Sequence, residues 1–258
     1  MKIVVLVKEV PDTYGDRKLS LETGLADRAA SESVLDEIGE RALEVALSYA
    51  DGHPGTEVVV LSMAAESASA TVRKGLAMGA TSALQVIDDA LLGADLGLTA
   101  EVLAAALQRA GFDLVIAGNL STDGSGGVIP AMIAELLGVP SATALSDVEI
   151  NPGKVSGVRS LDGATMAVSA TLPAVISITE ALPAARLPNF KGIMAAKRKP
   201  LETLSLADLS IDAEDHSASR SIVIGLSETA PRAAGVKITD EGNAGERLAE
   251  FLIQNRFV

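Results

Sequence analysis

Apolar residues in the first 140 positions alternate between short runs and longer patterns with helical spacing. The short runs, which are rich in β-formers, are Ile3 to Val7, Glu57 to Ser62, Ala83 to Ile87 and Asp113 to Ala117. Between the first two, the segment Val34 to Tyr49 has apolar residues at 35, 38, 42, 45, 46 and 49, which share one helical face. This order predicts βαβ units, an α/β fold whose parallel sheet is covered by helices on both faces.

Further helical patterns follow, and after Pro140 the apolar residues change to short alternating runs. Helical spacing recurs over Ser67 to Met78, Leu98 to Ala110 and Val128 to Leu137. After Pro140 come three short alternating runs separated by turn residues, Asp147 to Ile150, Lys154 to Val158 and Thr165 to Ser169. They predict a small antiparallel excursion over about 145–170, and the apolar run Pro173 to Thr179 is expected to return to the main sheet.

The last quarter of the chain is more polar. It contains one strand candidate, Ser221 to Ile224, and a closing helix, Ala244 to Asn255. A tail with so few apolar residues is better suited to wrapping a partner than to forming its own core. We therefore expect a domain over residues 1–200, followed by a C-terminal arm over residues 201–258.

Composition and charge exclude several classes of function. The 258 residues include 34 acidic and 21 basic side chains, a net charge of −13, and no cysteine. Disulfides, thiol catalysis and cysteine-rich metal sites are excluded, and two distant histidines make a zinc site improbable, so we expect no metal. The acidic charge and six aromatic residues argue against nucleic-acid binding. Without a signal architecture or a long apolar run, we expect a cytoplasmic protein with no membrane insertion.

The glycine-rich segment Gly118 to Gly127, which leads into the helix predicted at Val128, is the most informative local signal. Glycines at the carboxyl end of a strand let backbone N–H groups surround a phosphate, and the helix dipole favours the negative charge. An ordinary flexible loop with a Ser or Asp cap explains the spacing equally well. The segment is neither a Walker A motif nor a Gly-x-Gly-x-x-Gly turn after the first strand, which weakens the classical nucleotide-binding readings.

The basic segment from Arg186 to Pro200 holds five cations and no acid, which leaves 16 basic and 34 acidic residues, a net charge of −18, elsewhere. Its one aromatic residue, Phe190, lies beside Lys191. An exposed aromatic side chain among cations is typical of a docking surface, although Phe190 packing back on its own domain explains the pattern as well. No Ser-His-Asp triad or carboxylate pair can be assembled, so the chain looks equipped to hold a ligand and a partner.

Segments from end to end of the chain match one family. They include KIVVLVKEVPD at 2–12, TVRKGLAMGA at 71–80, IMAAKRKP at 193–200 and RAAGVKI at 232–238. In these the chain resembles the β subunits of the electron transfer flavoprotein family. The resemblance implies a Rossmann-like domain of the adenine nucleotide hydrolase-like type, an electron carrier and not an enzyme. It also implies an α subunit that carries most of the FAD site, a structural AMP, acyl-CoA dehydrogenase donors of fatty acid oxidation and a membrane quinone oxidoreductase as acceptor.

The resemblance also implies site residues. Those of the AMP site are Leu6, Asp36, Glu37, Ile38, Gly39, Met63, Ser121, Thr122, Asp123, Gly124, Ser125, Gly126, Gly127, Val128, Ile129 and Met132. Tyr14 and Ile38 are expected near the flavin. Docking to the dehydrogenase is expected through Phe190, with Leu187 as the competing anchor, and through Lys191, Ile193 and Met194.

Taken without the resemblance, Asp36 and Glu37 fit favourable contacts with a helix dipole better than a ribose contact, and Met63 fits core filling better than an adenine pocket. Two alternatives for the function stay open. One is a bifurcating flavoprotein with a second FAD in place of AMP, and the other is a stand-alone adenine nucleotide sensor or hydrolase. The family often has a glutamate after Arg159, so with Ser160 here we expect no identical salt bridge to the flavin domain.

Overall fold

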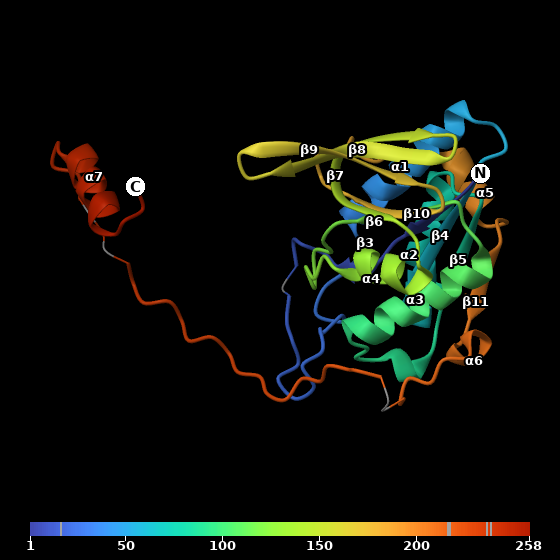
Figure 1. Cartoon of the computed structure of the whole chain (residues 1–258). Helices are drawn as coiled ribbons and strands as arrows, with labels where there is room; N and C mark the ends of the chain where they lie inside the picture. The colour runs from blue at the N-terminus through green and yellow to red at the C-terminus, as the bar shows by residue number, and fades with distance from the viewer. Residues whose placement is uncertain (16, 216–217, 236, 238) are drawn as a thin grey trace. The chain divides into compact units, whose positions relative to one another are not determined.

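The computed structural model describes residues 1–15, 17–215, 218–235, 237 and 239–258. The chain divides into a compact first unit, Met1–Ile224, and a second unit, Gly225–Val258. The first unit is built on a nine-stranded sheet in the order β11-β5-β4-β1-β6-β10-β7-β8-β9 (Figure 1). Every helix in the described part of the chain is too short or too polar to cross a bilayer.

The parallel part of the sheet confirms the predicted strands. Its central members are β1 (Lys2–Leu6), β4 (Glu57–Met63), β5 (Ser82–Val86), β6 (Leu114–Gly118) and β10 (Ala174–Ile178). Strand β1 pairs in parallel with β4 on one side and with β6 on the other. These strands are apolar throughout because both faces of the sheet are covered.

Helices cover the two faces as the periodicity predicts (Figure 1). On one face lie α1 (Glu37–Gly52) and α2 (Ser69–Met78), the latter preceded by the 3-10 turn η1 (Glu66–Ala68). On the other lie α3 (Leu96–Ala110), which follows η2 (Asp89–Leu91), and α4 (Ile129–Leu137). Successive residues of β1 point to opposite faces, so Ile3 packs in the core with α1 and α2, whereas Val4 packs in the core with α3 and α4.

The first helix begins later than its predicted start at Val34, which was wrong. Residues Ser33–Leu35 form the short strand β3, which pairs antiparallel with β2 (Glu9–Pro11). The β-branched Val34 pairs there with Val10, and Asp36 then takes the N-cap position of α1. A branched side chain fits an extended pair better than a helix, which explains the difference.

The antiparallel excursion is confirmed, but its strands are longer than predicted. They are β7 (Ser141–Asn151), β8 (Lys154–Leu161) and β9 (Ala164–Thr171). The start of β7 pairs in parallel with β10 before the rest of it pairs antiparallel with β8. The excursion is therefore a continuation of the main sheet.

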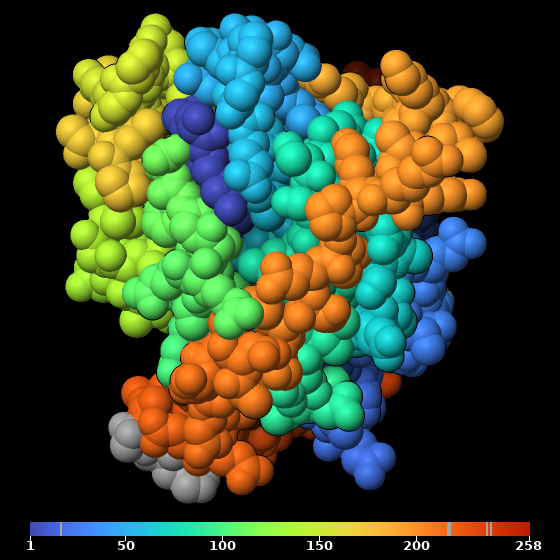
Figure 2. Space-filling model, turned by 90° about the vertical axis from the view of Figure 1, so that its right-hand side faces the viewer, coloured from blue at the N-terminus to red at the C-terminus, as the bar shows by residue number. Residues whose placement is uncertain are grey.

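The compact unit continues past residue 200, where we expected the arm to begin. Strand β11 (Leu201–Leu204) pairs in parallel with β5, and α6 (Leu206–Leu209) follows it. Leu204 and Leu206 are buried, which fixes this segment on the sheet, and Figure 2 shows it in orange along the surface of the first unit. The predicted strand Ser221 to Ile224 is wrong: its residues are in no strand, and the amide of Ser221 donates to Asp95 Oδ2 at 2.6 Å.

The second unit contains one helix in its described residues, α7 (Ala244–Gln254), which confirms the predicted closing helix. Its apolar side chains Leu248, Phe251 and Ile253 are exposed. The ring of Phe251 lies 6.3 Å from that of Phe257, so the end of the chain folds back on the helix.

Candidate functional site

The strand order reverses at the carboxyl ends of β1 and β6, and we call this part of the sheet edge the crevice. From β1 the chain moves outward through β4 and β5, and then returns by α3 to β6 on the opposite side of β1. Ligands in open α/β sheets bind where the strand order reverses in this way. The loop after β6, residues 119–128, lies at this point, together with the segment after β1 and the start of α1.

Asp36 is the acidic residue at the centre of this crevice. Its side chain is buried, with the residue 2% exposed, and Oδ2 accepts a hydrogen bond from the amide of Thr122 at 3.0 Å. The other oxygen, Oδ1, is buried and has no partner. Burial raises the pKa of Asp36 above 3.8, the nearby charge of Asp123 adds to the rise, and the amides of Thr122 and Ile38 oppose it. An unpaired buried acceptor of this kind fits a hydroxyl donor of a ligand.

The glycine-rich loop offers backbone donors. Its first amides are used within the chain, since Gly124 donates to Asp123 Oδ1 at 2.6 Å and Ser125 donates to the carbonyl of Ser121 at 3.0 Å. Among the described residues, no acceptor pairs with the amides of Gly126, Gly127, Val128 and Ile129. Positive φ angles at Ser125 (48°) and Gly127 (69°) curl the backbone just before α4. Such a curl at a helix N-terminus is the geometry that binds a phosphate.

Apolar residues flank these polar groups. Leu6 and Met63 end neighbouring strands, Ile129 and Met132 lie on α4, and all four are half-buried against the core beneath α3 and α4. Gly118 holds the start of α1 close to β6, because a Cβ there would lie 2.5 Å from Ile38 Cγ2. Asp36, Ile38 and the loop thus lie close together, whereas the Glu37 side chain is exposed and Tyr14 is 98% exposed.

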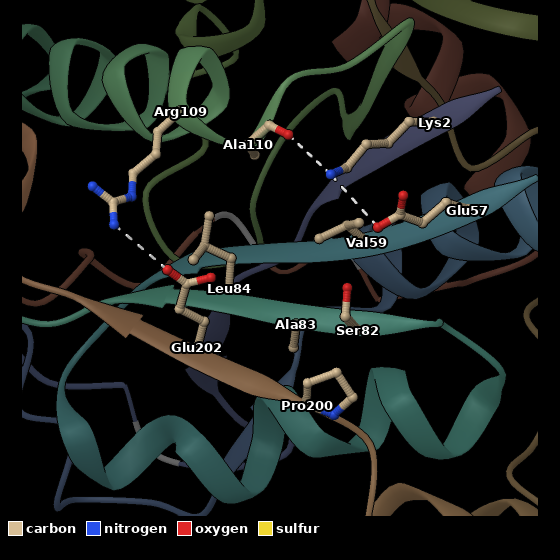
Figure 3. Close-up of a pocket in the computed structure, with 10 residues that line it drawn as sticks. All are labelled: Lys2, Glu57, Val59, Ser82, Ala83, Leu84, Arg109, Ala110, Pro200 and Glu202. Carbon is tan, nitrogen blue, oxygen red and sulfur yellow. Dashed lines mark hydrogen bonds and ion pairs between the residues drawn. The ribbon is translucent and has the colours of Figure 1, made fainter.

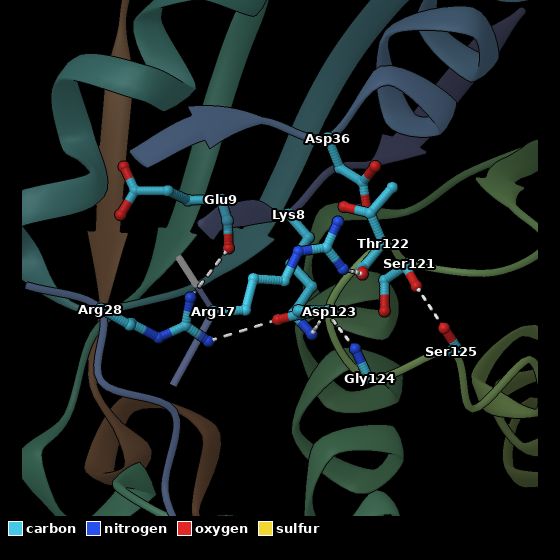
Figure 4. Close-up of polar contacts among 10 residues, drawn as sticks. All are labelled: Lys8, Glu9, Arg17, Arg28, Asp36, Ser121, Thr122, Asp123, Gly124 and Ser125. Carbon is cyan, nitrogen blue, oxygen red and sulfur yellow. Dashed lines mark hydrogen bonds and ion pairs between the residues drawn. The ribbon is translucent and has the colours of Figure 1, made fainter. Parts of the chain in front are cut away.

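Three cations, Lys8, Arg17 and Arg28, contact the loop (Figure 4), and we call them the cationic clasp. Lys8 Nζ lies 2.7 Å from Asp123 Oδ1, and Arg28 Nη2 lies 3.6 Å from Asp123 Oδ2. Arg17 donates to the carbonyl of Thr122. Burial alone would raise the pKa of Asp123, but the hydrogen bond and charge of Lys8 hold it below its usual value. The clasp could not be predicted from the sequence, because nothing in the spacing of the three cations links them to residue 123.

The predicted docking segment forms the short helix α5 (Phe190–Ala196), which is packed on α2. The Asn189 side chain accepts from the amide of Gly192 at 2.8 Å, and a Cβ on Gly192 would lie 2.3 Å from the carbonyl oxygen of Ala77. Phe190 is 80% exposed and Leu187 86% exposed. Ile193 and Met194 are exposed as well, so the segment presents an apolar surface and Phe190 does not pack back on the domain.

Two of the five cations of this segment point into the domain, which corrects the expected ring of cations. Arg186 pairs with Glu44 and Asp51 at 2.8 Å each. Lys199 Nζ donates to the carbonyls of Leu76 and Ala80 at the end of α2, at 3.0 and 2.6 Å, and burial lowers its pKa. These two cations hold the segment against the rest of the first unit. The position of Lys199 is also favourable because a positive charge stabilises the C-terminus of a helix. The exposed cations of the segment are Lys191, Lys197 and Arg198.

A groove lies at the opposite, amino-terminal edge of the sheet (Figure 3). This groove of about 380 Å³ is bounded by Lys2, Glu57, Arg109 and Glu202. Its charges satisfy one another, with Lys2 3.5 Å from Glu57 and Arg109 3.8 Å from Glu202. It contains none of the predicted site residues. Nowhere in the described ranges do three or more potential metal ligands cluster.

Comparison with known proteins gives consistent matches. The family model described as "Electron transfer flavoprotein domain" matches residues 23–209. The chain is 44% identical to the electron transfer flavoprotein subunit beta of Mycobacterium tuberculosis, over 99% of both chains. It is 34% identical to the subunit of that name from Bacillus subtilis, over 83% of both chains. It is also 34% identical to the caffeyl-CoA reductase-Etf complex subunit CarD of Acetobacterium woodii, over 83% of this chain and 82% of that one.

Proposed function

The chain belongs to the electron transfer flavoprotein family as a β subunit, an electron carrier that works with an α subunit, and we propose that its own ligand is AMP. In this proposal AMP is held in the crevice between β1 and β6 and has a structural role. The FAD of the heterodimer is held mainly by the α subunit. When bound, FAD accepts electrons from a donor and passes them to an acceptor.

The observation that carries the AMP proposal is the pairing of Asp36 with the loop after β6. The unpaired Oδ1 of Asp36 would accept a ribose hydroxyl, while the amides of Gly126 to Ile129 would hold the phosphate. Leu6 and Met63 supply half-buried apolar surface for the adenine ring. The hydrogen-bonding groups and the apolar residues present are therefore of the chemical types that a nucleoside monophosphate needs. Phosphate binding by amides needs no side chain at Gly124, Gly126 or Gly127.

The remaining surfaces fit the two partners. Phe190, Leu187, Ile193 and Met194 are exposed together on and beside α5, and they are proposed to anchor an acyl-CoA dehydrogenase, with Lys191 at the rim. Tyr14, which is fully exposed, and Ile38 are proposed to face the flavin. The exposed apolar residues of α7 are proposed to pack on the α subunit. A quinone oxidoreductase of the membrane is the proposed acceptor.

A second candidate is a bifurcating flavoprotein, in which the same crevice holds a second FAD. The similarity to a subunit of a caffeyl-CoA reductase-Etf complex favours keeping it, because that relative works in a complex with a reductase. A stand-alone adenine nucleotide sensor or hydrolase is the third candidate. Its difficulty is that it leaves the exposed surfaces of α5 and α7 without a use.

The nucleotides of the purified complex separate these candidates. The chain is co-expressed with the α subunit encoded by the same organism, purified, and denatured, and the released nucleotides are identified and counted by chromatography. The proposal expects one AMP and one FAD per heterodimer. Two FAD and no AMP would replace it by the bifurcating candidate. A chain that stays monomeric beside the α subunit and hydrolyses ATP would replace it by the third.

A further inference from the structure

Two of the three cations of the clasp are paired with a carboxylate of the loop that the clasp contacts. Asp123 Oδ1 lies 2.7 Å from Lys8 Nζ, and Asp123 Oδ2 lies 3.6 Å from Arg28 Nη2. Arg17 is directed to the carbonyl of Thr122, and Arg28 also donates to the carbonyl of Glu9 at 3.2 Å. Figure 4 shows the three cations converging on the loop, with the carboxylate of Asp123 between them.

The clasp lies beside the free amides. Lys8 Nζ is 4.0 Å from where a Cβ of Gly124 would stand, and the unpaired amides begin two residues later, at Gly126. Four consecutive amides at the start of α4 provide enough donors for one phosphate group. A second phosphate, attached to the first, would extend beyond the amides and need a cation, and two of the three cations that contact the loop, Lys8 and Arg28, are already held by Asp123.

We propose that Asp123 is a specificity-determining residue, which restricts the crevice to ligands with one phosphate group by occupying Lys8 and Arg28. The inference rests on the proposed function, since it concerns the ligand of that same site. A diphosphate would have to displace the carboxylate or accept its negative charge at close range. A monophosphate bears neither of these costs, because its oxygens accept hydrogen bonds from the amides of Gly126 to Ile129.

Other acids near the loop are engaged differently. Asp36 is buried behind the loop and accepts from Thr122, and Glu9 accepts from the Thr71 hydroxyl at 2.5 Å. Asp123 is the acid that belongs to the loop itself and contacts two cations of the clasp. Its depressed pKa keeps it ionised at neutral pH, so its charge is present when a ligand arrives.

The test compares AMP with ADP on the complete heterodimer. Bound nucleotide is removed by repeated exchange, and dissociation constants for AMP and ADP are measured by calorimetry for the wild type, Asp123→Asn and the double variant Asp123→Asn with Lys8→Met. The wild type should prefer AMP. Asp123→Asn should improve ADP binding relative to AMP about tenfold, because Lys8 and Arg28 are freed, and the added Lys8→Met should reverse most of the gain.

The control is Glu32→Gln. It removes one acidic charge from an exposed side chain of the N-terminal segment that also carries the three cations, and it should leave the ratio of the AMP and ADP dissociation constants unchanged. A ratio that stays within about twofold of the wild type in Asp123→Asn, while AMP still binds, overturns the role of Asp123 and leaves the proposed function standing. Failure of the wild type to bind any adenine nucleotide overturns the proposed function itself. If Asp123→Asn is poorly folded, Lys8→Met alone decides: it removes the cation that pairs with Asp123 at 2.7 Å and leaves the negative charge of Asp123 less compensated, so ADP binding should weaken more than AMP binding. Equal losses for ADP and AMP would then overturn the role of Asp123.

Discussion

The carboxylate of Asp36 accepts a hydrogen bond from the amide of Thr122 across 86 residues of sequence. Asp36 stands at the N-cap position of α1, the helix of the first crossover, and Thr122 lies in the loop after β6, on the opposite side of the reversal in strand order. The bond therefore ties together the two halves of the crevice. It also leaves one carboxylate oxygen, Oδ1, buried and available.

Substitution of Asp36 by Asn separates ligand binding from stability. The raised pKa means that the ionised carboxylate is disfavoured in the folded state, so above that pKa it weakens the fold. Asp36→Asn should therefore leave the melting temperature of the nucleotide-free heterodimer unchanged or higher. Its AMP affinity should fall about tenfold or more, since a hydrogen bond to a charged acceptor contributes about 1.5–3 kcal/mol. Calorimetric titration and thermal melts measure the two effects.

The matched control for this change is Asp95→Asn. Asp95 is also an aspartate at a helix N-cap, where it accepts from the amide of Leu98 at 2.8 Å, but it belongs to α3. AMP affinity should be insensitive to it. Equal losses of AMP affinity in both variants would show that the loss at Asp36 does not come from a contact with the ligand.

Gly127→Ala tests the curl of the loop. Gly127 has a φ of +69°, and an added Cβ would lie 2.8 Å from Leu120 Cδ2, so the variant must strain the loop or move Leu120. We expect a loss of stability of about 1 kcal/mol from the backbone conformation, and in addition a loss of AMP affinity. Gly111→Ala is the control, because Gly111 has the same φ of +69° with open space around its missing side chain. It should lose similar stability and keep its AMP; a parallel loss of AMP would contradict our assignment of the loop.

Phe190→Ala tests the docking surface. Exposed aromatic anchors contribute most of the energy of many interfaces, so coupling to an acyl-CoA dehydrogenase should weaken by about 2 kcal/mol with no change in nucleotide content. The rate of flavin reduction at varied dehydrogenase concentration measures this. Leu92→Ala, at an equally exposed leucine that directly follows η2, should have no effect. If Leu187→Ala weakens coupling and Phe190→Ala has no effect, the anchor is Leu187, three residues before Phe190.

Glu44→Gln tests how the basic segment is fastened to α1. Glu44 accepts from the amide, Nε and Nη2 of Arg186 at 2.8–2.9 Å. Burial would raise the pKa of Glu44, but these hydrogen bonds lower it overall below 4.5. Its contribution is therefore present above pH 4.5 and disappears as the pH falls through the lowered pKa. The variant should be less stable than the wild type by about 1 kcal/mol at neutral pH, a modest value because Arg186 is partly solvated.

Urea unfolding at several pH values measures the difference, which should shrink in acid. The control pair is Arg109 with Glu202, which is more exposed and longer at 3.8 Å, so Glu202→Gln should change stability very little. A stability difference for Glu44→Gln that persists unchanged below the lowered pKa would mean that shape, not charge, is responsible.

Much of the fold could be predicted because the chain repeats a simple alternation. The central strands are continuously apolar, and helices such as Leu96–Ala110 carry an apolar face, so periodicity alone indicates both. Strand β11 was missed because its sequence, Leu-Glu-Thr-Leu, resembles an exposed segment. It is a strand because it lies at the sheet edge, where one row of hydrogen bonds to β5 suffices and half of its side chains stay in water.

The site could be predicted only in part, for a related reason. The glycine loop is a local pattern, and it was found. The unpaired oxygen of Asp36 and the contact of Lys8 with Asp123 depend on residues 86 and 115 positions apart. No period or spacing in the sequence encodes such distances; they arise when strand order brings the ends of β1 and β6 together. The contacts of Arg186 with Glu44 and of Lys199 with the carbonyl of Ala80 could not be predicted for the same reason.

Amide hydrogen exchange of the heterodimer, with and without AMP, tests the central claim most directly. The account predicts that AMP slows exchange at Gly126, Gly127, Val128 and Ile129, because these amides gain phosphate oxygens as acceptors, and that the amide of Gly111 is unaffected. Protection that instead appears around Lys2 and Arg109, at the groove on the opposite edge of the sheet, or no change at the loop in the presence of saturating AMP, would contradict it.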